Sequence, residues 1–197
     1  MPQLPDASER LAATFVASPH PATIPTDQLL LQCELRTQPR SGPGGQHRNR
    51  TSSGAFLHHL PSSLVAEATE RRSQAENRNV VVQRLRFRLA LLLRTPSILD
   101  RTADATQNEA TEIDATESSV RQRYAGHPLR LNEQNEDKPA VMALLLNDLH
   151  ASGGQPSLVS KAWKVSTSRI VAFLKSHAPA FALVNQIRQH HGRGPLK

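Results

Sequence analysis

Three short stretches near the start of the chain have the mixed apolar and polar pattern of β-strands, at Glu34–Arg40, Gly54–Leu60 and Leu64–Thr69. The turn-forming residues Pro61-Ser62-Ser63 separate the second stretch from the third. Two short strands joined by such a turn form a hairpin. The pattern therefore predicts a small antiparallel sheet.

A longer segment then changes to helical spacing. Ser73 and Glu76 have the spacing of a capping box, in which each side chain reaches the other's backbone N–H, and Pro96 ends the helix. One face of this helix is apolar and another carries Arg84 and Arg88, with Arg86 on the flank. The apolar face consists of Val81, Val82, Leu85, Leu89 and Leu92. The order strand, loop, strand, strand, long helix predicts an α+β fold.

The remaining segments differ in composition. The proline-punctuated start predicts disorder, with a weak helical tendency at Ser8–Val16, and a stretch rich in Thr, Asp, Glu, Asn and Gln predicts a linker. Helical patterning returns at Ala140–Leu149 and at Ser157–His190. We therefore expect an N-terminal extension at 1–23, an α+β domain at 24–94, an acidic linker at 95–137, a C-terminal all-helical domain at 138–191 and a tail at 192–197.

Charge divides the chain in the same way. The 197 residues carry a net charge of +7, with +6 in residues 24–94, −5 in 95–137 and +7 in 138–197. Two basic blocks favour a polyanionic partner, above all a nucleic acid. Cys33 is the only cysteine, so no internal disulfide is possible, and we expect it to be a small buried residue. Apolar runs are too short to span a membrane and the start lacks signal-peptide features, which predicts a soluble cytoplasmic protein.

The loop between the first two predicted strands is the most informative segment. Ser41–Thr51 holds adjacent glycines, whose backbone can approach a ligand closely, and it contains no acidic residue. Arg40, Arg48 and Arg50 surround the glycines, as expected of a loop that meets phosphates or an RNA end. Composition alone favours an ordinary surface loop between strands over a functional one.

The order of residues in this loop resembles the signature of class I peptide chain release factors and related ribosome-rescue hydrolases. In those proteins a Gly-Gly-Gln loop is followed by His or Ser, a variable residue, Asn, a basic residue and a small residue. The resemblance continues through His59-Leu60-Pro61 and Glu70–Arg78 and covers roughly residues 24–94. The matching loop residues are Gly44, Gly45, Gln46, His47, Asn49, Arg50 and Thr51.

The resemblance implies ribosome-dependent hydrolysis of the ester in peptidyl-tRNA. The backbone N–H of Gln46 would stabilise the leaving 3′ oxygen and its side chain would position water, while Gly44 and Gly45 keep the loop free of side chains. Its partners would be peptidyl-tRNA and the rRNA of the large-subunit peptidyl transferase centre, with a monomeric protein and no cofactor, metal or membrane. RNA contacts are expected from Arg40, His47, Arg48, Asn49, Arg50, Arg71, Arg72, Arg84 and Arg88.

Two departures from the release factors affect the expected role. Only 43 residues precede Gly44, too few for a codon-reading region, so we expect codon-independent release, as in termination on stalled ribosomes. The dense Lys/Arg tail of rescue hydrolases is replaced by a mildly basic helical segment. The alternative is a non-catalytic module that binds the ribosome or another nucleic acid through both basic blocks.

A second Gly-Gly-Gln at 153–155 lacks flanking Arg and Asn, and we interpret it as a helix C-cap and interhelical turn. The following segment, Leu158–Leu174, resembles a DNA-binding helix-turn-helix with its turn at 164–166. A small helical bundle with a solvated basic face fits equally well. Trp163 is expected in the core. The possible phosphate contacts are Lys161, Lys164, Arg169 and Lys175.

Overall fold

The computed structural model describes residues 4–38, 53–100 and 114–197. The chain divides into two compact units. The first, here the α+β unit, is Ile24–Leu89. The second, here the helical unit, joins the residues up to Thr23 with Ala90–Lys197. The α+β unit thus ends at Leu89, slightly before the predicted boundary, and is inserted within the sequence of the helical unit.

The α+β unit contains a three-stranded antiparallel sheet in the order β2-β3-β4, which confirms the predicted fold class. A short helix, α1 (Thr26–Leu31), precedes the sheet and the long helix α3 (Gln74–Leu92) follows it. The strands are β2 (Cys33–Gln38), β3 (Gly54–His59) and β4 (Leu64–Ala68), close to the predicted ranges.

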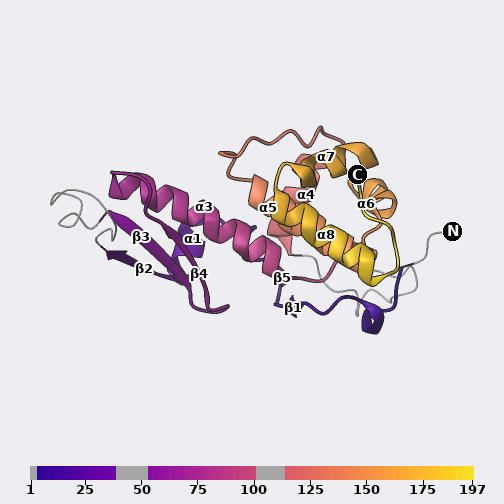
Figure 1. Ribbon diagram of the computed structural model, residues 1–197, viewed down its shortest axis with the longest axis horizontal. Coiled ribbons are helices and arrows are strands. Elements are labelled where there is room, and N and C mark those ends of the chain that lie inside the picture. Colours follow the sequence, from indigo (N-terminus) through magenta and orange to yellow (C-terminus); the bar gives the residue numbers. More distant parts are fainter. Residues whose placement is uncertain (1–3, 39–52, 101–113) are drawn as a thin grey trace. The chain divides into compact units, whose positions relative to one another are not determined.

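Small residues form the sheet's contribution to the core. Ala55 pairs with Ala68 and Leu57 with Ala66, so all four side chains lie on one face, and all are buried. α3 runs along the sheet (Figure 1) and buries the predicted residues Val81, Val82, Leu85 and Leu89.

Two predictions for α3 were wrong. Leu92, expected on the apolar face, is 48% exposed because it lies beyond the end of the α+β unit and its sheet. Arg86, expected on the flank, is buried. A long arginine stem can be covered by apolar neighbours, which the residue type alone does not reveal.

The helical unit is built around α5 (Lys138–Ala151), which is buried along its whole length. A helix that is apolar on nearly all sides belongs in the centre of a bundle. Valine, leucine and aromatic residues of the surrounding helices pack against it. These helices are α4 (Ala115–Tyr124), α6 (Pro156–Trp163), α7 (Thr167–Lys175) and α8 (Ala178–His190).

The N-terminal segment is ordered from residue 4 onward, so the prediction of a mostly disordered extension was wrong for this part. It contains a 3₁₀ turn, η1 (Ala7–Glu9), and a strand, β1 (Thr14–Phe15), that pairs in parallel with β5 (Leu93–Arg94). His20 is fully buried. Prolines disfavour helices, but the residues between them, here Thr14 and Phe15, keep their N–H groups and can pair with a distant strand, which composition does not show.

Much of the predicted linker is also ordered. A 3₁₀ turn, η2 (Ile98–Asp100), follows β5, and α4 places Val120 in the core of the helical unit together with Leu129. Residues 101–113 lie outside the described part. The acidic composition of 95–137 was misleading because several of its polar side chains are buried with partners rather than solvated.

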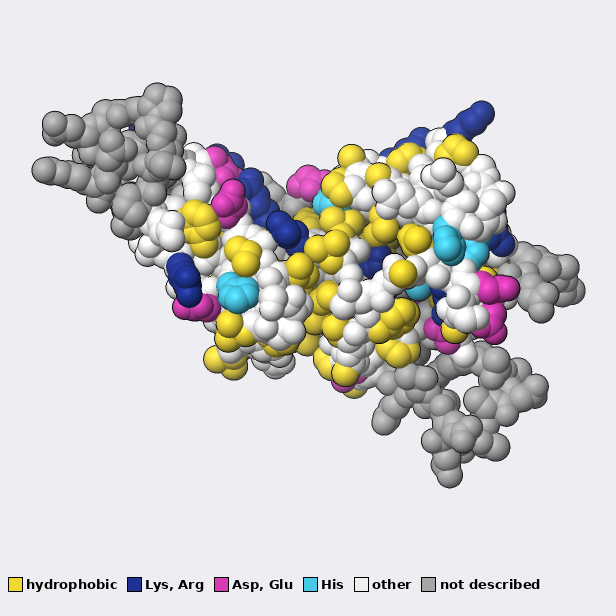
Figure 2. All heavy atoms as spheres, turned by 60° about the horizontal axis from the view of Figure 1, so that its bottom comes forward, with side chains coloured by type: hydrophobic (Ala, Val, Ile, Leu, Met, Phe, Trp, Pro, Cys, Tyr) yellow, Lys and Arg dark blue, Asp and Glu magenta, His cyan; other side chains and the backbone are white. Residues whose placement is uncertain are grey.

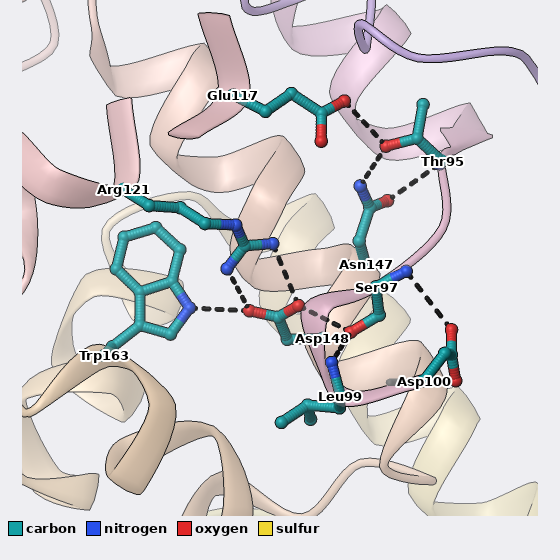
Figure 3. Close-up of polar contacts among 9 residues, drawn as sticks. All are labelled: Thr95, Ser97, Leu99, Asp100, Glu117, Arg121, Asn147, Asp148 and Trp163. Carbon is teal, nitrogen blue, oxygen red and sulfur yellow. Dashed lines mark hydrogen bonds and ion pairs between the residues drawn. The ribbon is translucent and has the colours of Figure 1, made fainter. Parts of the chain in front are cut away.

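A buried polar network connects this segment to α5 (Figure 3). Asp148 on α5 is fully buried, and both of its oxygens accept hydrogen bonds from the Arg121 guanidinium, at 2.6 and 3.0 Å. Trp163 Nε1 donates to the same carboxylate at 2.7 Å, and so does Ser97 Oγ at 2.7 Å. The Arg121 guanidinium also lies 5.2 Å from the centre of the Trp163 ring. Trp163 is therefore a core residue, as predicted.

The second Gly-Gly-Gln is the turn between α5 and α6, as predicted. Gly153 and Gly154 have φ values of 61° and 72°, a region that favours glycine. The next turn also matches the predicted helix-turn-helix: Lys164 has a left-handed conformation, and the Ser166 side chain caps α7 by accepting a hydrogen bond from the Arg169 N–H.

Candidate functional site

The predicted catalytic loop and its flanking RNA contacts lie outside the described residues, but the structure describes the strands on both sides of it. β2 ends at Gln38, and Gln38 is paired with Gly54 at the start of β3. Both ends of segment 39–52 are therefore held at one end of a two-stranded stem. The predicted residues in that segment are Arg40, Gly44, Gly45, Gln46, His47, Arg48, Asn49 and Arg50.

The base of this stem is tightly packed at Gly54. A Cβ atom on Gly54 would lie 3.0 Å from the Gln38 carbonyl oxygen and 3.2 Å from Cγ2 of Thr69. Such distances are shorter than ordinary van der Waals contact, and the nearer atom belongs to the partner strand's backbone. A side chain at this paired position next to the loop segment would therefore force the neighbouring atoms to shift.

Asn77 in the first turns of α3 forms hydrogen bonds at the base of the same stem. Its buried Nδ2 donates to the Ser53 carbonyl at 2.6 Å and to the Arg71 carbonyl at 2.9 Å. Its Oδ1 accepts from the Arg71 N–H at 3.0 Å. One side chain thus ties the residue next to the loop, the segment after β4 and the start of α3 together.

Asn77 holds Arg71, one of the predicted RNA-binding residues, near the loop stem. Two of the three bonds just described are made by the Arg71 backbone, and Arg72 follows Arg71 in the chain. Both arginines are exposed, and neither forms an ion pair within the described residues. Their cations therefore remain available to an external anion.

Arg84, another predicted RNA contact, forms an ion pair within the unit. Its guanidinium donates to both carboxylate oxygens of Glu70, at 2.6 and 3.2 Å, and to the Glu67 carbonyl at 2.8 Å. Although burial acts to raise the pKa of Glu70, the backbone N–H groups of Glu70 and Thr69 and the Arg84 guanidinium lower it. Much of the Arg84 charge is therefore neutralised by Glu70, whereas Arg88, one turn further along α3, is exposed.

Sequence reasoning assigned no role to Asn77, Ser53 or Gly54. Asn77 could have been suspected from its place, because an amide four residues after the capping serine lies in the first turns of a helix, facing the preceding segment. The capping box itself is half formed: the Glu76 N–H donates to Ser73 Oγ at 3.4 Å.

Among the described residues of this unit, the side chains with metal-binding or nucleophilic chemistry show no further site. Cys33 is half-buried rather than buried, and burial raises the pKa of its thiol to about 11, so the thiol stays protonated at neutral pH. Within residues 4–38, 53–100 and 114–197, no three His, Cys, Asp or Glu side chains gather in a way that could hold a metal ion.

Several large hydrophobic side chains are exposed on the described part of the chain. Figure 2 shows hydrophobic side chains reaching the surface on one face of the molecule, and the most exposed large ones in the described part include Leu31, Phe15 and Leu60. No helix in the described ranges combines the length and apolar character needed to cross a membrane.

Comparison with protein families gives a match that includes this part of the chain. The model of the RF-1 domain matches residues 24–136, which include the loop segment, the stem, α3 and α4. The chain belongs to the RF-1 domain family. The match extends past residue 94, so the family segment is longer than the sequence predicted.

Individual relatives point the same way. Over 142 residues the chain is 31% identical to "Peptide chain release factor 1" of Jannaschia sp. (strain CCS1), covering 70% of this chain and 38% of the relative. Over 49 residues it is 51% identical to "Peptide chain release factor 2" of Acidovorax sp. (strain JS42), covering 25% of this chain and 13% of that protein. Over 55 residues it is 42% identical to "Peptide chain release factor 1-like, mitochondrial" of Rattus norvegicus, covering 28% and 15%. The chain therefore spans well under half the length of these relatives.

Proposed function

We propose that this chain hydrolyses the ester of peptidyl-tRNA on the ribosome, with Gly44-Gly45-Gln46 at the reacting centre. The observation that carries the proposal is the RF-1 domain match across a Gly-Gly-Gln segment held between two paired strands. The similar proteins described above are also named peptide chain release factors.

The chemistry requires little from the protein beyond positioning. Water attacks the ester carbonyl, the bond to the tRNA 3′ oxygen breaks, and that oxygen leaves with a proton as a hydroxyl. The backbone N–H of Gln46 stabilises the negative charge developing on the 3′ oxygen, and the Gln46 side chain orients the water. Gly44 and Gly45 let the loop backbone approach the tRNA end without obstruction.

The cations around the stem bind rRNA in this proposal. Arg71, Arg72 and Arg88 are exposed. Arg84 contributes less because Glu70 already neutralises it. The remaining contacts are those predicted in the loop, from Arg40, His47, Arg48, Asn49 and Arg50. Since each phosphate contact releases a counterion, binding to ribosomes should weaken as salt rises.

Codon independence is the finer part of the proposal. We expect this 197-residue chain, acting as a monomer in the cytoplasm, to release peptide whichever codon occupies the decoding site. The test is a release assay on ribosomes carrying labelled peptidyl-tRNA, with a stop codon, a sense codon or no codon in the A site. Equal rates support ribosome rescue, whereas release restricted to stop codons would contradict it.

A non-catalytic binding module is the second candidate. The observation in its favour is the basic helical unit, whose residues 138–197 carry a net charge of +7. The same assay separates the two functions, because a pure binding module would associate with ribosomes and release no peptide.

A further inference from the structure

The C-terminal part of the helical unit is basic without compensating acids. Residues 149–197 contain seven Lys and Arg residues and no Asp or Glu. The nearest preceding acid, Asp148, is fully buried and bound to Arg121. No ion pair in the described ranges involves Lys161, Lys164 or Lys175. The positive charge of this region is therefore exposed to solvent and free to bind an anion.

Part of this surface is hollowed into a groove of about 610 Å³, here the α7 groove. One face of α7 forms its floor, while the first turn of α6, one residue of α8 and the last two residues of the chain form its walls. The lining residues are Pro156, Ser157, Thr167, Ser168, Val171, Ala172, Lys175, Arg188, Leu196 and Lys197.

α7 has two distinct faces. Ile170, Phe173 and Leu174 are buried in the core of the helical unit. The opposite face, which lines the groove from Thr167 to Lys175, carries small and hydroxyl-bearing residues that leave the helix accessible. In a helix-turn-helix this is the face of the second helix that meets the nucleic acid.

The polar lining consists of hydrogen-bond donors and cations. Hydroxyl groups come from Ser157, Thr167 and Ser168, and cations from Lys175 and Arg188 on two different helices, with Lys197 at the chain end. No Asp or Glu is among the lining residues. Hydroxyls and cations beside the apolar side chains of Pro156, Val171 and Ala172 match a sugar-phosphate backbone, whose phosphates accept hydrogen bonds and whose sugars are largely apolar.

Arg188 is held in place without being neutralised. Its Nη1 donates to the Gly154 carbonyl at 2.6 Å and its Nε to the Gly194 carbonyl at 2.7 Å, so neutral backbone groups fix the guanidinium. Burial, and then repulsion from Arg193, lower the pKa of Arg188. A bound phosphate would relieve this repulsion.

We propose that the α7 groove binds the sugar-phosphate backbone of folded RNA and thereby anchors the chain on the ribosome. The inference rests on the proposed function for its choice of RNA. Duplex RNA has a deep, narrow major groove that does not admit a helix, so contact is made to phosphates and 2′-hydroxyls. The hydroxyl-bearing face of α7, walled by Leu196 and Lys197, suits such backbone contact.

The test measures binding of the full chain to isolated ribosomes across a salt titration. Lys175→Glu is compared with Arg130→Glu, which makes the same change in net charge at an exposed residue of the helical unit outside the groove. We expect Lys175→Glu to weaken binding severalfold and to reduce the log–log salt slope by about one, whereas Arg130→Glu retains the wild-type slope.

A second groove variant is needed because Lys175 Nζ also lies 5.7 Å from the Phe181 ring centre, so Lys175→Glu could weaken binding through altered packing. Lys197→Glu, at the chain end, should give the same loss. If both groove variants bind ribosomes as Arg130→Glu does, the anchor is elsewhere. If the wild-type chain prefers a DNA duplex to an RNA duplex of equal length, the RNA assignment is wrong.

The experiment distinguishes failure of the proposed RNA binding in the groove from failure of the proposed catalysis. Groove variants should lower the affinity of the chain for ribosomes, which the binding titration measures without peptide release. A wild-type chain that binds ribosomes and releases no peptide would remove the proposed catalysis while leaving the groove's RNA binding intact, and the salt titration would still report it.

Discussion

The side chain of Asn77 donates a 2.6 Å hydrogen bond to the carbonyl oxygen of Ser53, the first described residue after the predicted catalytic loop. The same amide holds both backbone polar groups of Arg71. Through these contacts a helix residue sets the position of the loop's stem, although it is distant from the loop in sequence.

Replacing Asn77 by Asp should damage this stem. The substitution keeps the shape of the side chain but replaces a donor facing two carbonyls with a carboxylate oxygen, so the buried acceptors lose their partner. We expect a loss of about 2 kcal/mol or more in the free energy of unfolding, measured by urea denaturation, and slower peptide release. Asn79→Asp, at an exposed position of the same helix, is the matched control and should change the stability little.

The two Gly-Gly-Gln segments should respond oppositely to substitution. Gln46→Ala should abolish peptidyl-tRNA hydrolysis without changing the unfolding transition. Gln155→Ala, in the turn that begins α6, should leave release unchanged. A release assay and a thermal melt on both variants decide the matter, and loss of release on changing Gln155 alone would show that the wrong segment had been chosen.

The buried Arg121–Asp148 pair should be costly to break from one side. Asp148→Ala leaves a buried guanidinium and the Trp163 N–H without their acceptor, so we expect the helical unit to lose about 3–5 kcal/mol of stability. Removing the remaining charge as well, in Asp148→Ala with Arg121→Met, should recover part of this loss. A double variant no more stable than the single one would mean that the buried cation is not the cause.

Acid should weaken the helical unit through His20. Its Nδ1 accepts from the Ala22 N–H at 3.0 Å and its Nε2 lies 3.2 Å from the Leu93 carbonyl, so both ring nitrogens are satisfied in the neutral tautomer. Burial lowers the pKa of His20 from 6.5 to about 4. The unfolded chain therefore binds a proton between these two pH values while the folded chain does not, and stability falls as the pH drops through this window.

The full effect of His20 corresponds to about 3 kcal/mol between pH 7 and pH 4. Glu117 acts with the opposite sign: burial raises its pKa, so the stability linked to it is present at low pH and is lost as the pH rises through its folded pKa. Comparison with His20→Gln isolates the histidine. Urea unfolding from pH 7 to pH 4.5 should show a flatter profile for the variant, and parallel profiles would contradict the assignment.

Local patterns in the sequence predicted the elements but not all of their packing. The strand ranges, α3, the glycine turn before α6 and the core position of Trp163 follow from turn chemistry, periodicity and residue type, which act over a few positions. His20 and Glu117 were missed because their environment depends on contacts between segments far apart in the chain, such as the 2.7 Å bond from the His20 N–H to the Glu117 carboxylate.

For the candidate site, the sequence indicated the family but not which charged side chains are paired. The order of residues around Gly44 was enough to indicate the family, because the residues that define this motif are contiguous in the sequence. The neutralisation of Arg84 by Glu70 was not visible, since β4 and α3 must first pack before these side chains meet. Charge runs show which residues are basic, but only the fold shows which of them are already paired.

The insertion of the α+β unit within the helical unit also determines the order in which the protein can fold during synthesis. β1 emerges early but has no partner until β5 has been made, whereas the sheet of the α+β unit is complete at Ala68. During synthesis, all strands of the α+β unit are therefore available before the helical unit is complete. The core of the helical unit can form only when α5 and the helices after it have left the exit tunnel. Until β5 has been synthesised, β1 remains unpaired.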